Sequence, residues 1–135
     1  MSVAVEDFAG FRPCLILAHA DSVYAARVLR AFRRQGWDVY AAHSGPEARR
    51  LARMLQPQVV VLQADLPEES GWLTCDKLTR ENPSVRVVLV GDDPTPHLAD
   101  FAAFVGAAAL IGRADGAGGL LDYGQEPALP LPAVG

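Results

Sequence analysis

The sequence has few of the features that mark a secreted or membrane-spanning protein. It contains only two cysteines, Cys14 and Cys75, which form neither a metal-ligand spacing nor a disulfide framework. Its longest apolar run covers residues 101–111 and is far too short to cross a bilayer. Glu6 and Asp7 precede any apolar run, whereas a signal peptide begins with basic residues. We therefore expect a cytoplasmic protein with reduced thiols.

Charge and composition further limit which partners and which kind of fold the chain can have. The net charge is −4, so the chain as a whole is not drawn to nucleic acid or to an anionic membrane. Half of the 135 residues are hydrophobic, which is typical of one globular domain that folds without a metal or a disulfide. Seven of the 12 basic residues lie within residues 27–53, and we interpret them as solvated helix faces.

Short apolar runs alternate along the chain with amphipathic stretches. The predicted strands cover residues 14–18, 37–42, 59–62, 85–90 and 107–111. The predicted helices cover residues 22–35 with Ser22 as N-cap, 44–56 with Ser44 and Glu47 as a capping box, 72–81, 98–105 and a short or frayed 116–122. This alternation predicts a parallel sheet with right-handed crossovers.

The chain divides into three parts by composition. We expect an N-terminal extension over residues 1–11, a folded domain over residues 12–122, and a Pro-rich tail or linker over residues 123–135. The tail contains Pro127, Pro130 and Pro132.

In open parallel sheets, ligands bind at the carboxyl ends of the strands. The candidate site therefore consists of the residues that follow the predicted strands. These are His19, Ala20, Asp21, Gln63, Ala64, Asp65, Gly91, Asp92, Gly112 and Arg113. We expect Arg113 to pair with Asp21, Asp65 or Asp92 rather than with an external anion.

One spacing pattern is more specific than the rest. Pro57 lies six residues before Gln63, while Pro67 and Gly71 lie four and eight residues after it. In this frame the chain resembles a CheY-like receiver domain of bacterial two-component response regulators, over about residues 12–122. The resemblance implies a doubly wound, flavodoxin-like α/β fold with five parallel strands in the order 2-1-3-4-5. It also implies a signalling module rather than an enzyme.

The residues that carry receiver chemistry are missing from the positions that the resemblance assigns to them. The phospho-acceptor falls on Gln63, the acidic Mg²⁺-binding pair on His19 and Ala20, the hydroxyl residue on Gly91, the lysine on Arg113 and the aromatic switch on Leu110. Mg²⁺ prefers carboxylate oxygens, and an amide is no nucleophile for phosphoryl transfer. We therefore interpret the chain as a degenerate receiver that acts by protein–protein interaction, without phosphorylation, cofactor or resident metal.

We expect the partner to be a protein or a domain, a second copy of this chain included, and neither nucleic acid nor a membrane. The resemblance indicates residues 98–121 as the signalling face. Trp72 and Leu73, at the start of the third helix, are candidates for partner contact and for core packing alike.

Three alternatives stay open. Asp65 is an alternative phospho-acceptor, which would make the chain an active receiver, but its spacing to the flanking prolines and glycine argues against it. His19 with Asp21 and Asp65 is an alternative transition-metal site, set against a hydrogen-bonded loop histidine. A small flavodoxin-like ligand-binding domain, holding flavin or cobalamin, would need a phosphate-cradling loop or a histidine motif that residues 17–22 lack.

Overall fold

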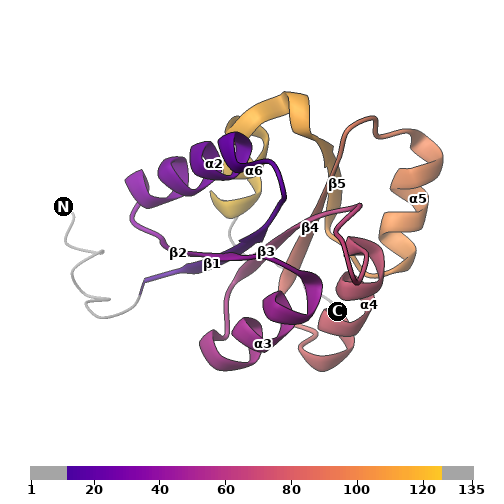
Figure 1. The fold of residues 1–135 in the computed structure, drawn as a ribbon, viewed down its shortest axis with the longest axis horizontal. Coiled ribbons are helices and arrows are strands. Elements are labelled where there is room, and N and C mark those ends of the chain that lie inside the picture. Colours follow the sequence, from indigo (N-terminus) through magenta and orange to yellow (C-terminus); the bar gives the residue numbers. More distant parts are fainter. Residues whose placement is uncertain (1–11, 126–135) are drawn as a thin grey trace.

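A computed structural model describes residues 12–125 and arranges them as a central sheet between two layers of helices (Figure 1). The strands are β1 (Cys14–Ala18), β2 (Asp38–Ala42), β3 (Val59–Gln63), β4 (Arg86–Gly91) and β5 (Ala109–Gly112). All neighbouring pairs are parallel, and the order is β2-β1-β3-β4-β5. The predicted fold class and strand order are confirmed.

Helices cover both faces of this sheet. They are α2 (Ser22–Arg34), α3 (Gly45–Leu55), α4 (Gly71–Glu81), α5 (Pro96–Phe104) and α6 (Gly116–Gln125), with a 3₁₀ turn, η1 (Arg113–Asp115), before α6. The helices α2 and α6 pack on one face, and α3, α4 and α5 pack on the other (Figure 1). Among the residues that the structure describes, no helix is long and apolar enough to cross a membrane.

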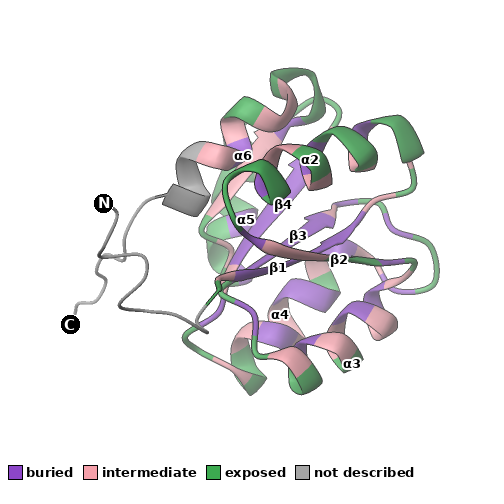
Figure 2. Ribbon diagram, turned by 90° about the vertical axis from the view of Figure 1, so that its left-hand side faces the viewer, coloured by how far each residue is buried: buried purple, intermediate pink, exposed green. Residues whose placement is uncertain are grey.

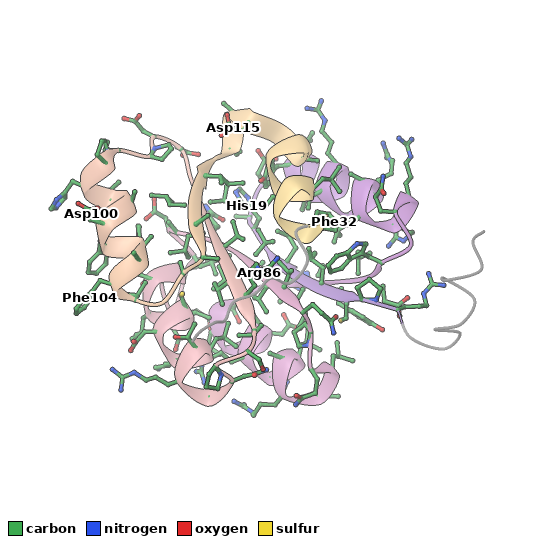
Figure 3. All side chains as sticks on the ribbon, turned by 180° about the vertical axis from the view of Figure 1, so that it is seen from behind. His19, Phe32, Arg86, Asp100, Phe104 and Asp115 are labelled. Atoms are coloured by element: carbon green, nitrogen blue, oxygen red, sulfur yellow. The ribbon has the colours of Figure 1, made fainter. Side chains whose placement is uncertain are left out.

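The core consists of two clusters, one on each face of the sheet. Leu15 and Leu17 of β1 contribute to the cluster under α2 and α6, while Ile16 of the same strand contributes to the cluster under α3, α4 and α5. Figure 2 shows buried residues along the sheet and on the inward faces of the helices. Since both faces of β1 are covered, its sequence is apolar without alternation. Figure 3 shows the contrast between buried Phe32 of α2 and Phe104 of α5, which projects outward.

Several helix starts differ from the prediction. The helix α4 begins at Gly71 rather than at residue 72, and α5 begins at Pro96 rather than at residue 98, because Thr95 Oγ1 caps it by accepting from the Leu98 N–H at 3.2 Å. The N-cap of α2 is Asp21, not Ser22, because the Asp21 carboxylate accepts hydrogen bonds from the N–H groups of Val23 and Tyr24 at 3.0 and 3.1 Å. A carboxylate at this end is also favoured by the helix dipole.

The predicted capping box at the start of α3 is present only in part. Ser44 Oγ accepts from the Glu47 N–H at 3.2 Å, as expected. The Glu47 carboxylate, however, accepts from the N–H of His43 at 2.6 Å rather than from that of Ser44. At the other end, Gln56 terminates α3 in the left-handed region with φ 53°, which confirms the predicted end.

The chain from residue 107 onward departs most from the prediction. The strand β5 begins at Ala109, not at residue 107, because pairing with β4 starts there. The helix α6 continues to Gln125, three residues beyond the expected domain boundary, and η1 was not predicted. Burial of Leu120 against the α2 side of the sheet compensates for the weak helix propensity of the glycines in α6. Residues 1–11 and 126–135, which hold the expected extension and most of the expected tail, lie outside the described residues.

Candidate functional site

The strand register brings the predicted site residues to one edge of the sheet. Gln63 pairs with Val90 in neighbouring strands, and Gly91 pairs with Gly112. The loops that follow these positions therefore meet at the carboxyl edge of the sheet, where ligands of open α/β folds bind.

Gln63 is joined to the loop after β1 through its side chain. Its Oε1 atom accepts a hydrogen bond from the Ala20 N–H at 2.7 Å. The backbone around it is equally constrained, because the Gly71 N–H donates to the Ala64 carbonyl at 2.9 Å. A Cβ at Gly71 would lie 2.2 Å from the Gln63 carbonyl oxygen, so the loop after β3 requires glycine there. This contact gives a physical reason for the eight-residue spacing seen in the sequence.

His19 is a hydrogen-bonded loop histidine. Its Nδ1 accepts from the Asp21 N–H at 3.0 Å, and its ring packs on Tyr24 with centroids 4.7 Å apart. Burial lowers the pKa of His19 below its usual 6.5, and Arg113 lowers it further against the opposing effects of Asp21 and Asp92. The lowered pKa favours the neutral imidazole, which carries its proton on Nε2 because Nδ1 accepts the Asp21 N–H. Among residues 12–121, whose side chains the structure describes, no group of three or more His, Cys, Asp or Glu side chains is placed to hold a metal ion.

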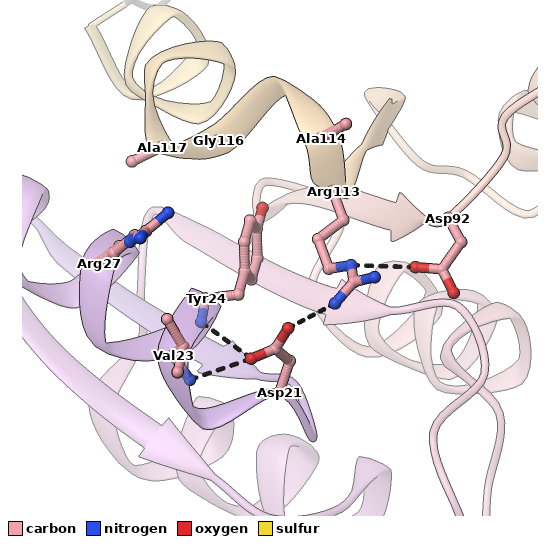
Figure 4. A pocket seen from close by; sticks show the side chains of 9 residues that line it. All are labelled: Asp21, Val23, Tyr24, Arg27, Asp92, Arg113, Ala114, Gly116 and Ala117. Atoms are coloured by element: carbon pink, nitrogen blue, oxygen red, sulfur yellow. Dashed lines mark hydrogen bonds and ion pairs between the residues drawn. The ribbon is translucent and has the colours of Figure 1, made fainter.

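Arg113 connects the ends of three strands (Figure 4). Its Nη1 donates to Asp21 Oδ2 at 2.5 Å, and its Nε lies 3.1 Å from Asp92 Oδ1. The expected internal pairing is confirmed with these two aspartates and does not include Asp65. Hydrogen bonds from the Tyr24 N–H and from Arg113 hold the pKa of Asp21 below its usual value. Both carboxylates are thus paired with the same guanidinium, and the three side chains together keep one negative charge.

The other predicted positions contribute little polar chemistry. Ala20 is exposed and offers only its N–H to Gln63. Asp65 is exposed in the turn after β3 and makes no hydrogen bond or ion pair with any residue in the described range. Leu110 is half-buried against the α3–α5 core cluster. A Cβ at Gly91 would meet the Leu110 Cδ1 at an ordinary 3.7 Å, so packing does not demand glycine there.

A pocket of about 320 Å³ lies beside this ion pair network, between α2 and the start of α6 (Figure 4). Among the lining residues that the sequence analysis missed, Tyr24 and Arg27 carry polar groups. Both follow Asp21 at a spacing of three along α2, and this helical period is the signal that groups them on one face. Tyr24 Oη is buried with no hydrogen-bond partner among the side chains that the structure describes, and burial raises the pKa of Tyr24 to about 12.

Glu69, also missed, anchors the loop that follows β3. Its carboxylate accepts from Arg49 Nε at 3.0 Å and Nη2 at 3.1 Å, from Lys77 Nζ at 2.9 Å and from Thr74 Oγ1 at 2.7 Å. Burial alone would raise the pKa of Glu69, but these hydrogen bonds outweigh it and lower the pKa to about 2. The network ties the loop to both α3 and α4.

Comparisons with known proteins agree with this architecture. A family model described as the response regulator receiver domain matches residues 16–113. Over 80 residues the chain is 39% identical to the probable transcriptional regulatory protein TcrX of Mycobacterium tuberculosis (strain ATCC 25618 / H37Rv). That match covers 58% of this chain and 34% of TcrX, so the chain spans only about a third of that relative.

Solved structures share the fold at low sequence identity. The Vibrio cholerae chemotaxis protein CheY4 superposes with a TM-score of 0.77 at 16% identity, covering 85% of this chain and 98% of that one. A Burkholderia pseudomallei response regulator, solved with a phosphorylated aspartic acid, a calcium ion and citrate, gives a TM-score of 0.74 at 22% identity. The second match covers 90% of this chain and 76% of that one.

Proposed function

Because this chain belongs to the family of response regulator receiver domains, we propose that it is a signalling module that binds a partner protein or domain without being phosphorylated. The observation that carries this proposal is the hydrogen bond from the Ala20 N–H to Gln63 Oε1 at 2.7 Å. A neutral amide stands at the position that the resemblance assigns to the phospho-accepting carboxylate. An amide oxygen is not a nucleophile for phosphoryl transfer.

The side chains around Gln63 do not fit the Mg²⁺ ion that receiver chemistry needs. Mg²⁺ is usually held by carboxylate oxygens and water. At the two positions of the acidic pair, His19 supplies an imidazole whose Nδ1 already accepts a hydrogen bond, and Ala20 supplies only a methyl group. Asp21 and Asp92, which also follow strands at this edge, are paired with Arg113. A phosphoryl group would therefore find neither its nucleophile nor its counter-charge at this edge.

The geometry does not favour Asp65 as a substitute acceptor. Its side chain is exposed in the turn after β3. Arg113, the cation at this edge, is already shared between two other aspartates. Phosphoryl transfer needs neutralisation of charge on the moving oxygens, and Asp65 makes no ion pair with any cation in the described range.

We also propose that binding uses a constitutive face formed by α5, β5 and α6, within residues 98–121. In the family pattern an aromatic residue at position 110 couples this face to the phosphorylation site. Here the residue is Leu110, which is partly buried and packs on the core. Without an aromatic ring at position 110, no rotamer change couples this face to position 63, and the face keeps a single conformation.

Phosphorylation of repaired variants tests the loss of receiver chemistry. We expect no added phosphoryl mass when the natural chain, or the Gln63→Asp variant alone, is incubated with Mg²⁺ and acetyl phosphate. Adding His19→Asp and Ala20→Asp to Gln63→Asp should restore Mg²⁺ binding and stoichiometric modification, because metal ligands and nucleophile then return together. Intact mass and amide shifts on Mg²⁺ or beryllofluoride titration measure the outcome.

The control for this experiment is the triple variant carrying Asp65→Asn as well, which should be modified to the same extent. Stoichiometric modification of the Gln63→Asp single variant would contradict the claimed loss of metal ligands. Modification of the natural chain that Asp65→Asn abolishes would establish the active-receiver alternative. Local amide shifts at Gln63 when Mg²⁺ alone is added to the natural chain would also count against the proposal.

Charge reversal tests the binding face separately. For a partner protein isolated with the natural chain, Asp100→Lys on α5 should weaken the affinity at least tenfold. Arg50→Glu, an exposed change on α3, is the matched control and should leave it unchanged. Equal affinities for the natural chain and Asp100→Lys would place the interface elsewhere.

A further inference from the structure

The pocket between α2 and the start of α6 has no role in the function proposed above (Figure 4). Its volume of about 320 Å³ lies within the range of small-molecule binding sites. One end is bounded by Asp21 and Asp92, which share the guanidinium of Arg113 and keep one negative charge. The other end is bounded by Arg27 and by the start of α6, and its chemistry is different.

Tyr24 supplies a hydroxyl group that has no partner. The residue is only 6% exposed, and its Oη atom makes no hydrogen bond with any residue that the structure describes. In Figure 4 its ring lies between Arg27 and Arg113, and the hydroxyl points toward the segment that leads into α6. Burial raises the pKa of Tyr24 to about 12, so the hydroxyl stays protonated at neutral pH and can donate a hydrogen bond. A buried donor without an acceptor is costly, and a bound acceptor would remove that cost.

Arg27 supplies a positive charge that has no counter-ion. It is exposed on α2, and its guanidinium makes no ion pair or hydrogen bond with another residue in the described range. The helix α2 itself contains no acidic residue. The two aspartates at the other end of the pocket are engaged by Arg113, which leaves Arg27 available. A guanidinium is well suited to a carboxylate or a phosphate, because it offers two parallel N–H donors.

The start of α6 adds backbone donors to the same end of the pocket. Gly116 has φ 67° and ψ −165°, so it interrupts the helical run between η1 and α6 and makes the next residues a new helix start. Glycine has no side chain that could accept from the first N–H groups of α6, and the Asp115 carboxylate accepts from the Gly112 N–H at 3.2 Å instead. Gly116 and Ala117 both line the pocket. The first turn of a helix carries partial positive charge and favours an anion.

We propose that this end of the pocket binds the oxyanion of a small organic molecule, either a carboxylate or a phosphate. The Arg27 guanidinium neutralises the anion, while the Tyr24 hydroxyl and the first N–H groups of α6 donate hydrogen bonds to its oxygens. The negative charge kept by Asp21, Asp92 and Arg113 favours a ligand whose remaining part is neutral or cationic. The site involves neither Gln63 nor α5, so it does not depend on the function proposed above.

Titration of the natural chain with inorganic phosphate and, separately, with acetate tests the site. With ionic strength held constant by sodium chloride at pH 7, we expect saturable NMR shifts at the amides of residues 116–118 with at least one of the two probes. The probe that saturates identifies the oxyanion that the site prefers. The amides of α3, on the opposite face of the sheet, should not move. The absence of saturable shifts at residues 116–118 with both probes would overturn the proposal.

Three variants test which groups hold the bound probe. Arg27→Gln should weaken its affinity about tenfold, because hydrogen bonds to a charged group are the strong ones. Tyr24→Phe removes only the hydroxyl and should weaken the affinity about fivefold. Arg30→Gln changes an exposed arginine on the same helix that does not line the pocket, and this matched control should leave the affinity unchanged. Equal losses from Arg27→Gln and Arg30→Gln would show unspecific attraction to a cationic helix and overturn the proposal, as would an affinity that neither Arg27→Gln nor Tyr24→Phe changes.

Discussion

Replacing the buried carboxylate of Glu69 should destabilise the fold in a manner that depends on pH. The pKa of Glu69 falls from 4.5 to about 2. At about 1.4 kcal/mol per pKa unit, this difference corresponds to about 3 kcal/mol of stability in the ionised state. The pKa is depressed in the folded state, so this contribution is complete above pH 4.5 and is lost as the pH falls toward 2.

Glu69→Gln removes the charge and leaves Arg49, whose side chain is only 18% exposed, without its carboxylate. We expect the free energy of unfolding at pH 7 to fall by about 3 kcal/mol, because breaking a buried pair leaves an uncompensated charge. The difference between variant and natural chain should shrink steadily from pH 4.5 to pH 2. Urea denaturation at each pH measures both quantities.

The control for Glu69→Gln is Glu81→Gln. Glu81 pairs with Arg53 where both side chains are about half exposed, so the change should cost less than about 1 kcal/mol at any pH. Equal costs for the two variants at pH 7 would refute the reasoning. A cost for Glu69→Gln that does not vary with pH would refute it as well, since the network would then not depend on ionisation.

Further predictions concern the helix cap, two glycines and the buried phenol. Asp21→Ala should lower the midpoint of thermal unfolding by several degrees, while Ser22→Ala should leave it nearly unchanged, because only the first residue caps α2. In urea denaturation Gly71→Ala should cost about 2 kcal/mol or more through its backbone clash, whereas Gly91→Ala should stay within about 0.5 kcal/mol. Tyr24→Phe should raise the free energy of unfolding by about 1 kcal/mol, since it removes a buried hydroxyl that has no partner in the described range; a loss of stability would reveal one.

The fold could be predicted because its strongest determinants are local. A strand such as β1, buried on both faces, must be apolar at every position, and residues 14–18 are. The positions of the site residues followed as well, because parallel strands end at one edge. The same logic predicts from the sequence that Gln63 and Arg113 lie at that edge.

What could not be predicted depends on contacts between distant parts of the chain. Both Asp21 and Ser22 are good N-cap residues, and Asp21 is additionally held by Arg113, 92 positions away. In the sequence Glu69 is one of two adjacent acidic residues in a loop, yet in the structure basic residues from two different helices donate hydrogen bonds to it. The glycines of α6 predicted a short helix, since glycine has a low helix propensity. The packing of Leu120 under α2, which stabilises the longer helix, cannot be inferred from local propensity.

The way in which charge is balanced at the strand ends bears on how this domain signals. A receiver changes state when a phosphoryl group brings new negative charge to cations and metal at this edge. In this chain the guanidinium of Arg113 is already shared by Asp21 and Asp92, and the amide of Gln63 already accepts from Ala20. An added charge would have to break these bonds before it made its own. The arrangement therefore favours one state, and control over binding would have to come from outside the strand ends, through the partner's abundance or through competition at the α5 surface.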